Sequence, residues 1–390
     1  MSRPPLKRLE ALARESGASL LGALLRRTRL SPEELGAEFR AGRIRKLLLV
    51  RTYQGLGDLL CATPVIANLK AAVPSLDIQF LANTFNRAAV EGNPRLSKVW
   101  AWSEKLGAEP LGWLRLLRGL RAERFDAALV LSGNALSLTS VMLARLSGAR
   151  LVAGYEAAAY GKSWGSLLDC EVPFAYPKKE IDKFLGLIAG LGLPHQARRP
   201  EYFPSPEDER FAQTFHAFQL PKGEGPLVGI FLGGKVDRPE RIWPPQRYAA
   251  VARSLAEQPG ARILAIAPPQ PKAAAHRREG SVWLDEDVHE RSFREALGRD
   301  CPLLREGRLG RVAAVLKRLD LLICPDGGIM HLAAAVGAPT LALFFGTDPE
   351  VWQPPVETSR FLVASSGPAS LEVETVADKA RLLLSQRVGR

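Results

Sequence analysis

The sequence has few cysteines and no long hydrophobic segment. Its four cysteines, at positions 61, 170, 301 and 324, are widely separated and form no C-x-x-C pair, which argues against a zinc knuckle and a disulfide framework. No apolar run approaches the roughly 18 residues of a membrane-crossing helix. Charged residues interrupt the apolar stretch near the start, so no cleaved signal peptide is predicted. We therefore expect a reducing, cytoplasmic compartment.

The composition is that of an ordinary globular protein of two to three domains. Of the 390 residues, 46% are hydrophobic and 24% are charged, which excludes a disordered or fibrous chain. The formal net charge of +12 favours polyanionic partners, such as nucleic acid, phosphorylated small molecules or an anionic membrane surface. No RNA-binding aromatic motif and no recognition-helix pattern accompanies this charge, so nucleic acid is not expected as a partner.

Much of the positive charge lies in residues 1–45. Up to position 46 the sequence holds eleven Lys and Arg against five Glu. Leucines recur there at helical spacing with arginines between them, which predicts a basic amphipathic helical extension. Two hypotheses remain open at this stage. The helix packs on the body of the protein, or it attaches the protein peripherally to the anionic inner face of the plasma membrane.

Beyond residue 45, short apolar runs alternate with longer helical patterns, which predicts an α/β architecture. We predict a doubly wound Rossmann-like domain over 46–220, with an irregular, proline-rich passage over 155–225. A second such domain is predicted over 221–390, whose final helix, 373–385, is a candidate to pack back on the first domain. Two tandem domains of this kind imply a ligand cleft between them. The predicted strands are 46–53, 77–82, 98–102, 126–131, 150–154, 227–232, 262–267, 321–324 and 340–344.

The first candidate site follows the first predicted strand. Gly55, Gly57 and Asp58 open a helix there, and the free N–H groups of a helix start attract anions. The segment departs from a dinucleotide fingerprint, because Leu60 replaces the third glycine and Asp77 would begin the second strand rather than end it. Nicotinamide binding is therefore not expected. Asp58 fits both a helix cap and a reactive carboxylate.

The second candidate site lies between another predicted strand and helix. Gly327 and Gly328 leave backbone N–H groups uncovered at a helix N-terminus, a suitable site for a diphosphate. Asp326 in this turn can cap the helix or bind sugar hydroxyls, and His331 lies on the first turn. A glycine-rich turn with a capping Asp and a packed His fits the same residues.

A third candidate is Arg241 in the segment R-P-E-R-I-W-P-P, just beyond the first strand of the second domain. An arginine beside a rigid Trp-Pro segment can clamp a phosphate, although a surface loop has the same composition.

Two further segments suggest other ligands. Gly161-Lys162-Ser163 ends like a phosphate-binding loop, but Glu156 stands where that loop requires a glycine, which excludes a nucleoside triphosphatase of this type. Asp285 and Asp287 form a D-x-D pair that fits either a divalent-cation site or a solvated acidic loop.

Taken together, four ordered segments resemble glycosyltransferase family 9, the bacterial ADP-heptose:lipopolysaccharide heptosyltransferases. The resemblance spans about 46–386 and implies the GT-B fold, in which two Rossmann-like domains face each other across a cleft. It also implies an acceptor domain followed by a donor domain. The segments are VRTYQGLGDLLCATPVIANLKAAVP, LANTFNRAAVEGNP, ERIWPPQRYAAVARSL and PDGGIMHLAAAVGAPTLALFFGTDPEVWQP.

The resemblance also implies roles for individual residues. It makes Asp58 the general base, beside the loop glycines Gly55 and Gly57, and Arg241 the diphosphate-binding residue of a K-x-W-P segment. The family's donor-binding D-T-G-x-x-H segment corresponds to Asp326, Gly327, Gly328 and His331. Two departures leave the donor open: Gly327 replaces a Thr or Ser, and Arg241 replaces a Lys.

The expected function is transfer of a sugar, heptose from ADP-heptose, onto a lipopolysaccharide core or a related glycolipid. Displacement with inversion needs one carboxylate and one cationic cradle, so no metal and no cofactor is expected. Two alternatives remain: a transferase that uses a different nucleotide sugar, and a non-catalytic protein that binds nucleotide sugars or glycans.

Overall fold

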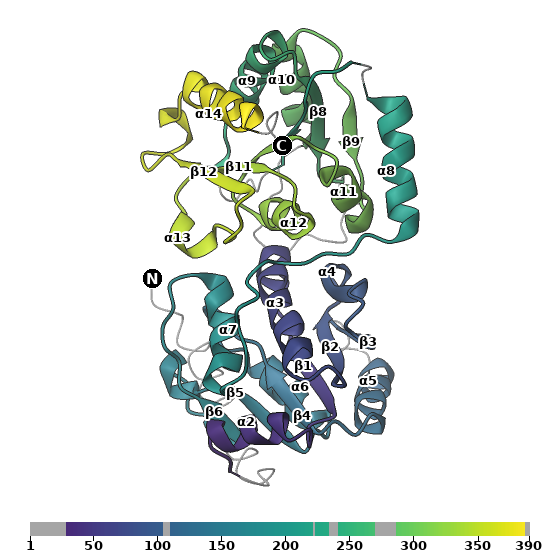
Figure 1. The fold of residues 1–390 in the computed structure, drawn as a ribbon, viewed down its shortest axis with the longest axis vertical. Coiled ribbons are helices and arrows are strands. Elements are labelled where there is room, and N and C mark those ends of the chain that lie inside the picture. Colours follow the sequence, from purple (N-terminus) through teal and green to yellow (C-terminus); the bar gives the residue numbers. More distant parts are fainter. Residues whose placement is uncertain (1–28, 104–109, 221–222, 234–240, 270–285, 387–390) are drawn as a thin grey trace. The chain divides into compact units, whose positions relative to one another are not determined.

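The computed structural model describes residues 29–103, 110–220, 223–233, 241–269 and 286–386 (Figure 1). The chain divides into two compact units, Met1–Arg198 and Arg199–Arg390. Each contains a six-stranded sheet in which every pairing is parallel, with helices between successive strands. The predicted α/β class with two doubly wound domains is therefore confirmed. No helix in the described ranges is both long enough and apolar enough to cross a bilayer.

The first sheet has the order β3-β2-β1-β4-β5-β6, and the direction of winding reverses between β1 and β4. Ligands of doubly wound sheets bind at the carboxyl ends of the strands where this reversal occurs. The strands are β1 (Lys46–Arg51), β2 (Asp77–Asn83), β3 (Lys98–Trp102), β4 (Ala127–Val130), β5 (Leu151–Tyr155) and β6 (Cys170–Val172). The α-helices are α2 (Pro32–Arg40), α3 (Leu56–Ala72), α4 (Ala88–Glu91), α5 (Pro110–Ala122), α6 (Leu138–Leu146) and α7 (Glu180–Gly190).

Strand β1 is buried on both faces, as the apolar run LLLV predicts. Leu48 and Val50 belong to one core cluster, together with Leu116 of α5 and Val141 of α6. Since side chains alternate along a strand, Leu47 and the other odd positions face the opposite layer, where α3 and α7 pack together. This burial fixes the strand and so fixes where its carboxyl end presents the following loop.

Glu123 joins the amino ends of three strands. Its carboxylate accepts hydrogen bonds from Lys46 of β1 at 2.8 Å, Gln79 of β2 at 2.9 Å and Lys98 of β3 at 3.0 Å. These donors lower the pKa of Glu123 to about 2. The polar residues at this end of the sheet thus bind one another, whereas the candidate residues lie at the carboxyl end.

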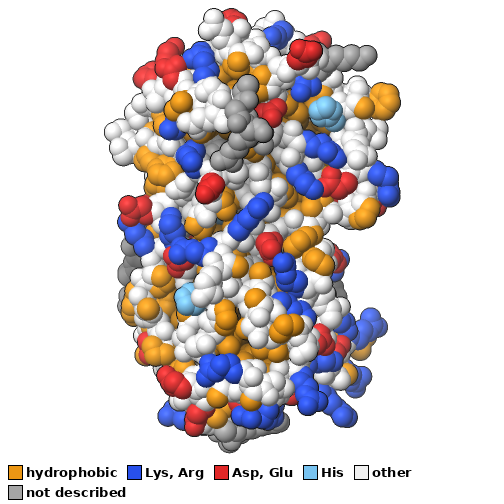
Figure 2. All heavy atoms as spheres, in the orientation of Figure 1, with side chains coloured by type: hydrophobic (Ala, Val, Ile, Leu, Met, Phe, Trp, Pro, Cys, Tyr) orange, Lys and Arg blue, Asp and Glu red, His pale blue; other side chains and the backbone are white. Residues whose placement is uncertain are grey.

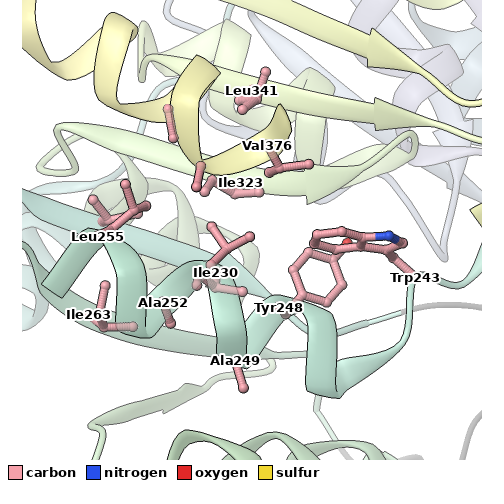
Figure 3. Packing of buried hydrophobic residues seen from close by; sticks show 14 of the residues in the cluster. Ile230, Trp243, Tyr248, Ala249, Ala252, Leu255, Ile263, Ile323, Leu341 and Val376 are labelled. Atoms are coloured by element: carbon pink, nitrogen blue, oxygen red, sulfur yellow. The ribbon is translucent and has the colours of Figure 1, made fainter. Parts of the chain in front are cut away.

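The second sheet has the order β12-β11-β10-β7-β8-β9, with its reversal between β7 and β10. Its core contains Ile230 of β7, Ile323 of β10, Leu255 of α9 and Val376 of α14 (Figure 3). The strands are β7 (Leu227–Phe231), β8 (Arg262–Ala267), β9 (Leu303–Arg305), β10 (Leu321–Pro325), β11 (Thr340–Phe344) and β12 (Ser359–Val363). The α-helices are α8 (Pro206–Gln219), α9 (Pro245–Glu257), α10 (Glu286–Leu297), α11 (Leu309–Leu316), α12 (Gly328–Val336), α13 (Pro349–Trp352) and α14 (Val373–Ser385).

Two sequence-based expectations differ from the structure. The passage over 155–225 is not irregular, because it contains β6, α7 and α8; α7 buries two charged residues, which masks its apolar face in the sequence. The units divide at 198/199 rather than 220/221, since α8 packs on α11 of the second unit. The final helix α14 packs against α9 of its own unit, where its apolar side chains enter the core. Its packing on the first domain stays a prediction.

The described part of the N-terminal extension belongs to the first unit. Helix α2 starts with a capping box formed by Ser31 and Glu34, and it contacts strand β6. Leu35 and Phe39 are completely buried there. Residues 30–45 are thus part of the folded unit, and the amphipathic segment predicted at the start lies largely in residues 1–28, outside the described residues.

Candidate active site

The loop between β1 and α3 is held by side chains from the neighbouring strand and its loop. Asn83, at the end of β2, donates from Nδ2 to the carbonyl of Thr52 at 3.1 Å. Asn86 donates from Nδ2 to the carbonyls of Tyr53 and Gly55, both at 2.9 Å. These bonds satisfy backbone groups that no strand partner reaches, so the start of α3 has a fixed position.

Asp58 lies on the first turn of α3, at the winding reversal of the first sheet. Gly55 is the N-cap residue of this helix, and no side-chain hydrogen bond caps it, so the helix-cap interpretation of Asp58 is not supported. The carboxylate lies so close to Gly55 that a Cβ there would overlap it. Gly55 is therefore required for the position of the carboxylate, and Gly57 precedes Asp58 within the same turn.

Arg51, which the sequence analysis did not single out, is the cation beside Asp58. Its Nη2 lies 3.5 Å from Oδ1 of Asp58, and its Nη1 donates to the carbonyl of Leu131, beyond β4, at 3.0 Å. The guanidinium also stacks over the ring of Phe184 at 4.5 Å and lies 5.2 Å from the ring of Tyr53. The sequence signal that could have identified Arg51 is its charge at the end of a buried strand, next to the winding reversal of the sheet.

Asp326 and Arg241 occupy the winding reversal of the second sheet. Asp326 follows β10 and accepts a hydrogen bond from Oγ1 of Thr347 at 2.8 Å. Burial raises the pKa of Asp326, while the Thr347 hydroxyl and the charge of Arg241 act in the opposite direction. The charge of Arg241 acts on the Asp326 carboxyl, so these two predicted residues lie near each other. Thr347 was not predicted from the sequence, because it follows β11 rather than β7 or β10.

Gly327 is the N-cap residue of α12, and Gly328 is the first residue of the helix. Gly327 has an extended backbone, with φ of 162°, and a Cβ at this position would meet no atom within 4 Å. A Thr or Ser would therefore fit there, so the departure from the family motif is not imposed by packing. Open space beside unobstructed N–H groups suits an anion at this helix start.

His331 is 2% exposed, and its ring lies edge-on to Trp352 with 6.4 Å between centroids. Burial lowers its pKa from 6.5 to about 4. The imidazole is consequently neutral at pH 7.

This pKa makes the stability of the second unit sensitive to acid. The unfolded chain binds a proton at residue 331 near pH 6.5, and the folded chain does so only near pH 4. Stability therefore falls as the pH drops through this window, by about 3 kcal/mol. We expect the free energy of unfolding in urea to depend less on pH in His331→Asn than in the parent. The measurement is hydrogen exchange of the backbone amides of β10 and β11. A residual slope should remain, because burial also lowers the pKa of His289. An identical slope in variant and parent would contradict the assignment.

Arg241 is positioned by a buried aromatic pair. Trp243, two residues later, is 1% exposed and packs edge-on against Tyr248 of α9 with 4.8 Å between centroids (Figure 3). His289 adds a second attachment, since its Nδ1 lies 2.7 Å from the carbonyl of Leu232, just beyond β7. The segment is thus anchored in the core rather than being only a surface loop.

The D-x-D candidate falls at the boundary of the described residues. Asp285 lies outside the described residues, and of Asp287 only the helical backbone of α10 is described.

Comparison with models of known protein families assigns the chain to a family. The model described as glycosyltransferase family 9 (heptosyltransferase) matches residues 113–379, well over half of the sequence. The chain belongs to glycosyltransferase family 9. It is therefore a glycosyltransferase of the heptosyltransferase type, as its resemblance to the family implied. The matched range contains Arg241, Asp326, Gly327, Gly328 and His331, whereas Gly55, Gly57 and Asp58 precede it.

Curated relatives of this glycosyltransferase agree with the assignment. It is 23% identical to lipopolysaccharide heptosyltransferase 2 of Escherichia coli K12 over 321 residues, which cover 80% of this chain and 86% of the relative. It is 20% identical to the lipopolysaccharide core heptosyltransferase OpsX of Haemophilus influenzae over 301 residues, 77% of this chain and 79% of the relative.

Solved structures show the same two-unit GT-B fold. The family 9 glycosyltransferase of Veillonella parvula superimposes with a TM-score of 0.75 at 19% identity, covering 88% of this chain and 98% of that one. Escherichia coli heptosyltransferase WaaC, solved with ADP, gives a TM-score of 0.67 at 19% identity, covering 87% and 99%.

Proposed function

We propose that this glycosyltransferase moves heptose from ADP-heptose onto a lipopolysaccharide core or a related cell-surface glycan, with inversion and without a metal ion. The observation that carries the proposal is which residues lie at the winding reversals of the two sheets. One presents the carboxylate of Asp58, and the other presents Arg241, Asp326 and an open helix start at Gly328. A base and an anion site are the two functions that displacement of a nucleoside diphosphate requires.

In the proposed step, the oxygen of the acceptor hydroxyl attacks the anomeric carbon, and Asp58 accepts the proton of that hydroxyl. The bond between that carbon and the diphosphate oxygen breaks, and the electron pair leaves with the nucleoside diphosphate. Attack opposite the leaving group inverts the anomeric configuration. Arg51 acts as a positioning residue, because its charge holds the carboxylate of Asp58 at one place beside Gly55.

The leaving group is stabilised by the second unit. Arg241 and the N–H groups at the start of α12 neutralise the charge that develops on the diphosphate. Asp326, fixed by Thr347, accepts hydrogen bonds from hydroxyls of the donor. His331 closes the buried side of this site as a neutral ring. Every step uses residues of the chain, so the reaction needs no cation and no cofactor.

Two features of the relatives support the donor and the acceptor. Escherichia coli WaaC was solved with ADP and with ADP-2-deoxy-2-fluoro heptose. The curated relatives are named as lipopolysaccharide or lipooligosaccharide heptosyltransferases. A glycolipid acceptor is carried by a membrane, so we place the protein in the cytoplasm with peripheral attachment to the inner face of the plasma membrane, partly through the basic residues 1–45.

The test is acceptor-dependent release of nucleoside diphosphate from a panel of ADP-heptose, UDP-sugars and GDP-sugars, with an extract of bacterial glycolipids. We expect release from ADP-heptose that EDTA does not change. Release only from another donor would overturn the donor assignment. Release that EDTA abolishes would overturn the metal-independent step and favour the D-x-D pair at 285 and 287. Donor binding without release, across acceptors of several core structures, would favour the non-catalytic alternative.

A further inference from the structure

Exposed apolar side chains of the first unit follow two adjacent strands, β2 and β3. Within the described residues of this unit, four large apolar side chains are strongly exposed, and each follows the carboxyl end of a strand. Phe85, 59% exposed, follows β2, and Leu111 and Leu114, 69% and 45% exposed, follow β3. Tyr176, 68% exposed, follows β6 at the opposite side of the sheet and packs edge-on against Phe174. Exposed apolar side chains that neighbour one another on a helix, as Leu111 and Leu114 do, indicate an interaction surface rather than random exposure.

Helix α5 has two distinct faces. Leu116, Leu117 and Leu120 are buried against the sheet, as helical spacing requires. The opposite face begins with Leu111 and Leu114 and continues with exposed arginines at positions 115, 118 and 121. The helix has no Asp or Glu, so nothing on it offsets this charge. Lys and Arg side chains accordingly gather at the margin of the first unit where α5 lies (Figures 1 and 2).

The loop that bears Phe85 adjoins the loop of the candidate base. Strand order places β1, β2 and β3 side by side, so Asp58 and Phe85 follow neighbouring strands, and α5 is the helix that comes after β3. Neighbouring strands are about 4.8 Å apart, so the distance from β1 to β3 is about 10 Å. Asn86, the residue after Phe85, donates a hydrogen bond to the carbonyl of Gly55. The carboxylate of Asp58 lies against the same glycine.

We propose that this α5 rim, formed by Phe85, Leu111, Leu114, Arg115 and Arg118, docks on the surface of an anionic lipid bilayer. Apolar side chains at one end of a helix, with arginines along the same face, are typical of helices that lie in a membrane interface. The apolar groups enter the acyl boundary, and the guanidinium groups bind lipid phosphates. A second copy of the chain fits poorly, since both surfaces would be basic and the chain carries a net charge of +12.

The inference rests on the proposed function and deepens it, because docking here would bring the first unit, which holds Asp58, to the membrane carrying the acceptor. It differs from the attachment proposed for residues 1–45, since the rim lies within the folded unit. Vesicle binding needs neither donor nor acceptor, so its outcome is independent of whether heptose is the sugar transferred.

The experiment is sedimentation of the full-length protein with vesicles of phosphatidylcholine mixed with phosphatidylglycerol, compared with phosphatidylcholine alone. We expect binding to the anionic vesicles only. Arg115→Gln with Arg118→Gln should lower the partition coefficient at least about tenfold, since each arginine near an anionic surface adds attraction. Leu111→Ser with Leu114→Ser should lower it by about tenfold through lost apolar burial. Transfer to a detergent-dispersed acceptor should persist in both variants.

Matched controls come from exposed residues of the second unit. Phe218→Ser on α8, where Phe218 is 80% exposed, and Arg291→Gln with Arg299→Gln, both exposed, should bind like the parent. As a second measurement, Leu111→Cys with an environment-sensitive dye should show a blue shift on anionic vesicles, since the four native cysteines are buried.

Three results would overturn the inference. The first is parental binding by both rim variants without a dye shift. The second is loss of binding only when Arg26 and Arg27 are replaced by Gln, which would assign attachment to residues 1–45. The third is a parent that is dimeric and becomes monomeric in the rim variants, which would make this face an interface between copies.

Discussion

Asp58→Asn should bind the nucleotide sugar as the parent does and yet transfer it about 10²–10⁴-fold more slowly. Asparagine keeps the volume of the side chain against Gly55 but cannot accept the acceptor proton at pH 7. Arg51 would remain held by the carbonyl of Leu131 and by the ring of Phe184, so the loop should keep its position. The measurement is the initial rate of acceptor-dependent diphosphate release, together with donor affinity by calorimetry.

The same unit offers a closely matched control. Asp182 on α7 has a side chain 29% exposed, against 28% for Asp58, and likewise pairs with an arginine, Arg198, at 2.7 Å. Asp182→Asn should leave the transfer rate within about twofold, because a surface ion pair contributes little. A rate in Asp58→Asn equal to that of this control would remove Asp58 from the reaction.

Arg241→Gln should lower kcat by about 10²–10³-fold, the effect of removing one group that stabilises developing negative charge. The loss should appear more in kcat than in KM, because the charge on the bridging oxygen grows as its bond to the anomeric carbon breaks. Removing the guanidinium also takes away the charge that opposes the rise in the pKa of Asp326. Steady-state kinetics with the donor varied gives both parameters.

Arg241→Lys separates charge from geometry at this position. A lysine keeps the charge but loses the planar fork of donors, so we expect an intermediate rate. Arg291→Gln, on the exposed face of α10, is the control and should match the parent. If Arg241→Gln changed only KM, the arginine would hold the donor in the ground state without assisting its cleavage.

Much of the scaffold was predictable because its signals are local. Strands β3, β8 and β11 and helix α14 have the predicted bounds, since apolar runs and helical periodicity with clear ends specify them. The edge strands β6, β9 and β12 were missed, because strands of three to five residues at a sheet edge carry little apolar pattern. Helix α7 was missed for a different reason, since its buried Glu180 and Lys183 form an ion pair at 2.9 Å and read as polar in the sequence.

The candidate site divides in the same way. Asp58, Arg241 and the segment from Asp326 to His331 could be proposed from the sequence, because each stands in a recognisable motif beyond a predicted strand. Their partners were not found. Thr347 reaches Asp326 from beyond β11, and Asn86 holds the Gly55 loop from beyond β2. No local pattern marks a residue whose role depends on a contact made by another strand.

The sequence by itself determined the α/β class, the two doubly wound domains, the family and the motifs at the strand ends. These follow from periodicity and turn chemistry, which act over a few residues. Only the tertiary structure decided that Arg51 is the partner of Asp58, that His331 is buried and neutral, and that Leu111 and Leu114 of α5 are exposed. Such properties depend on which strands lie side by side, and parallel order is set by packing across the whole sheet rather than by neighbours in the chain.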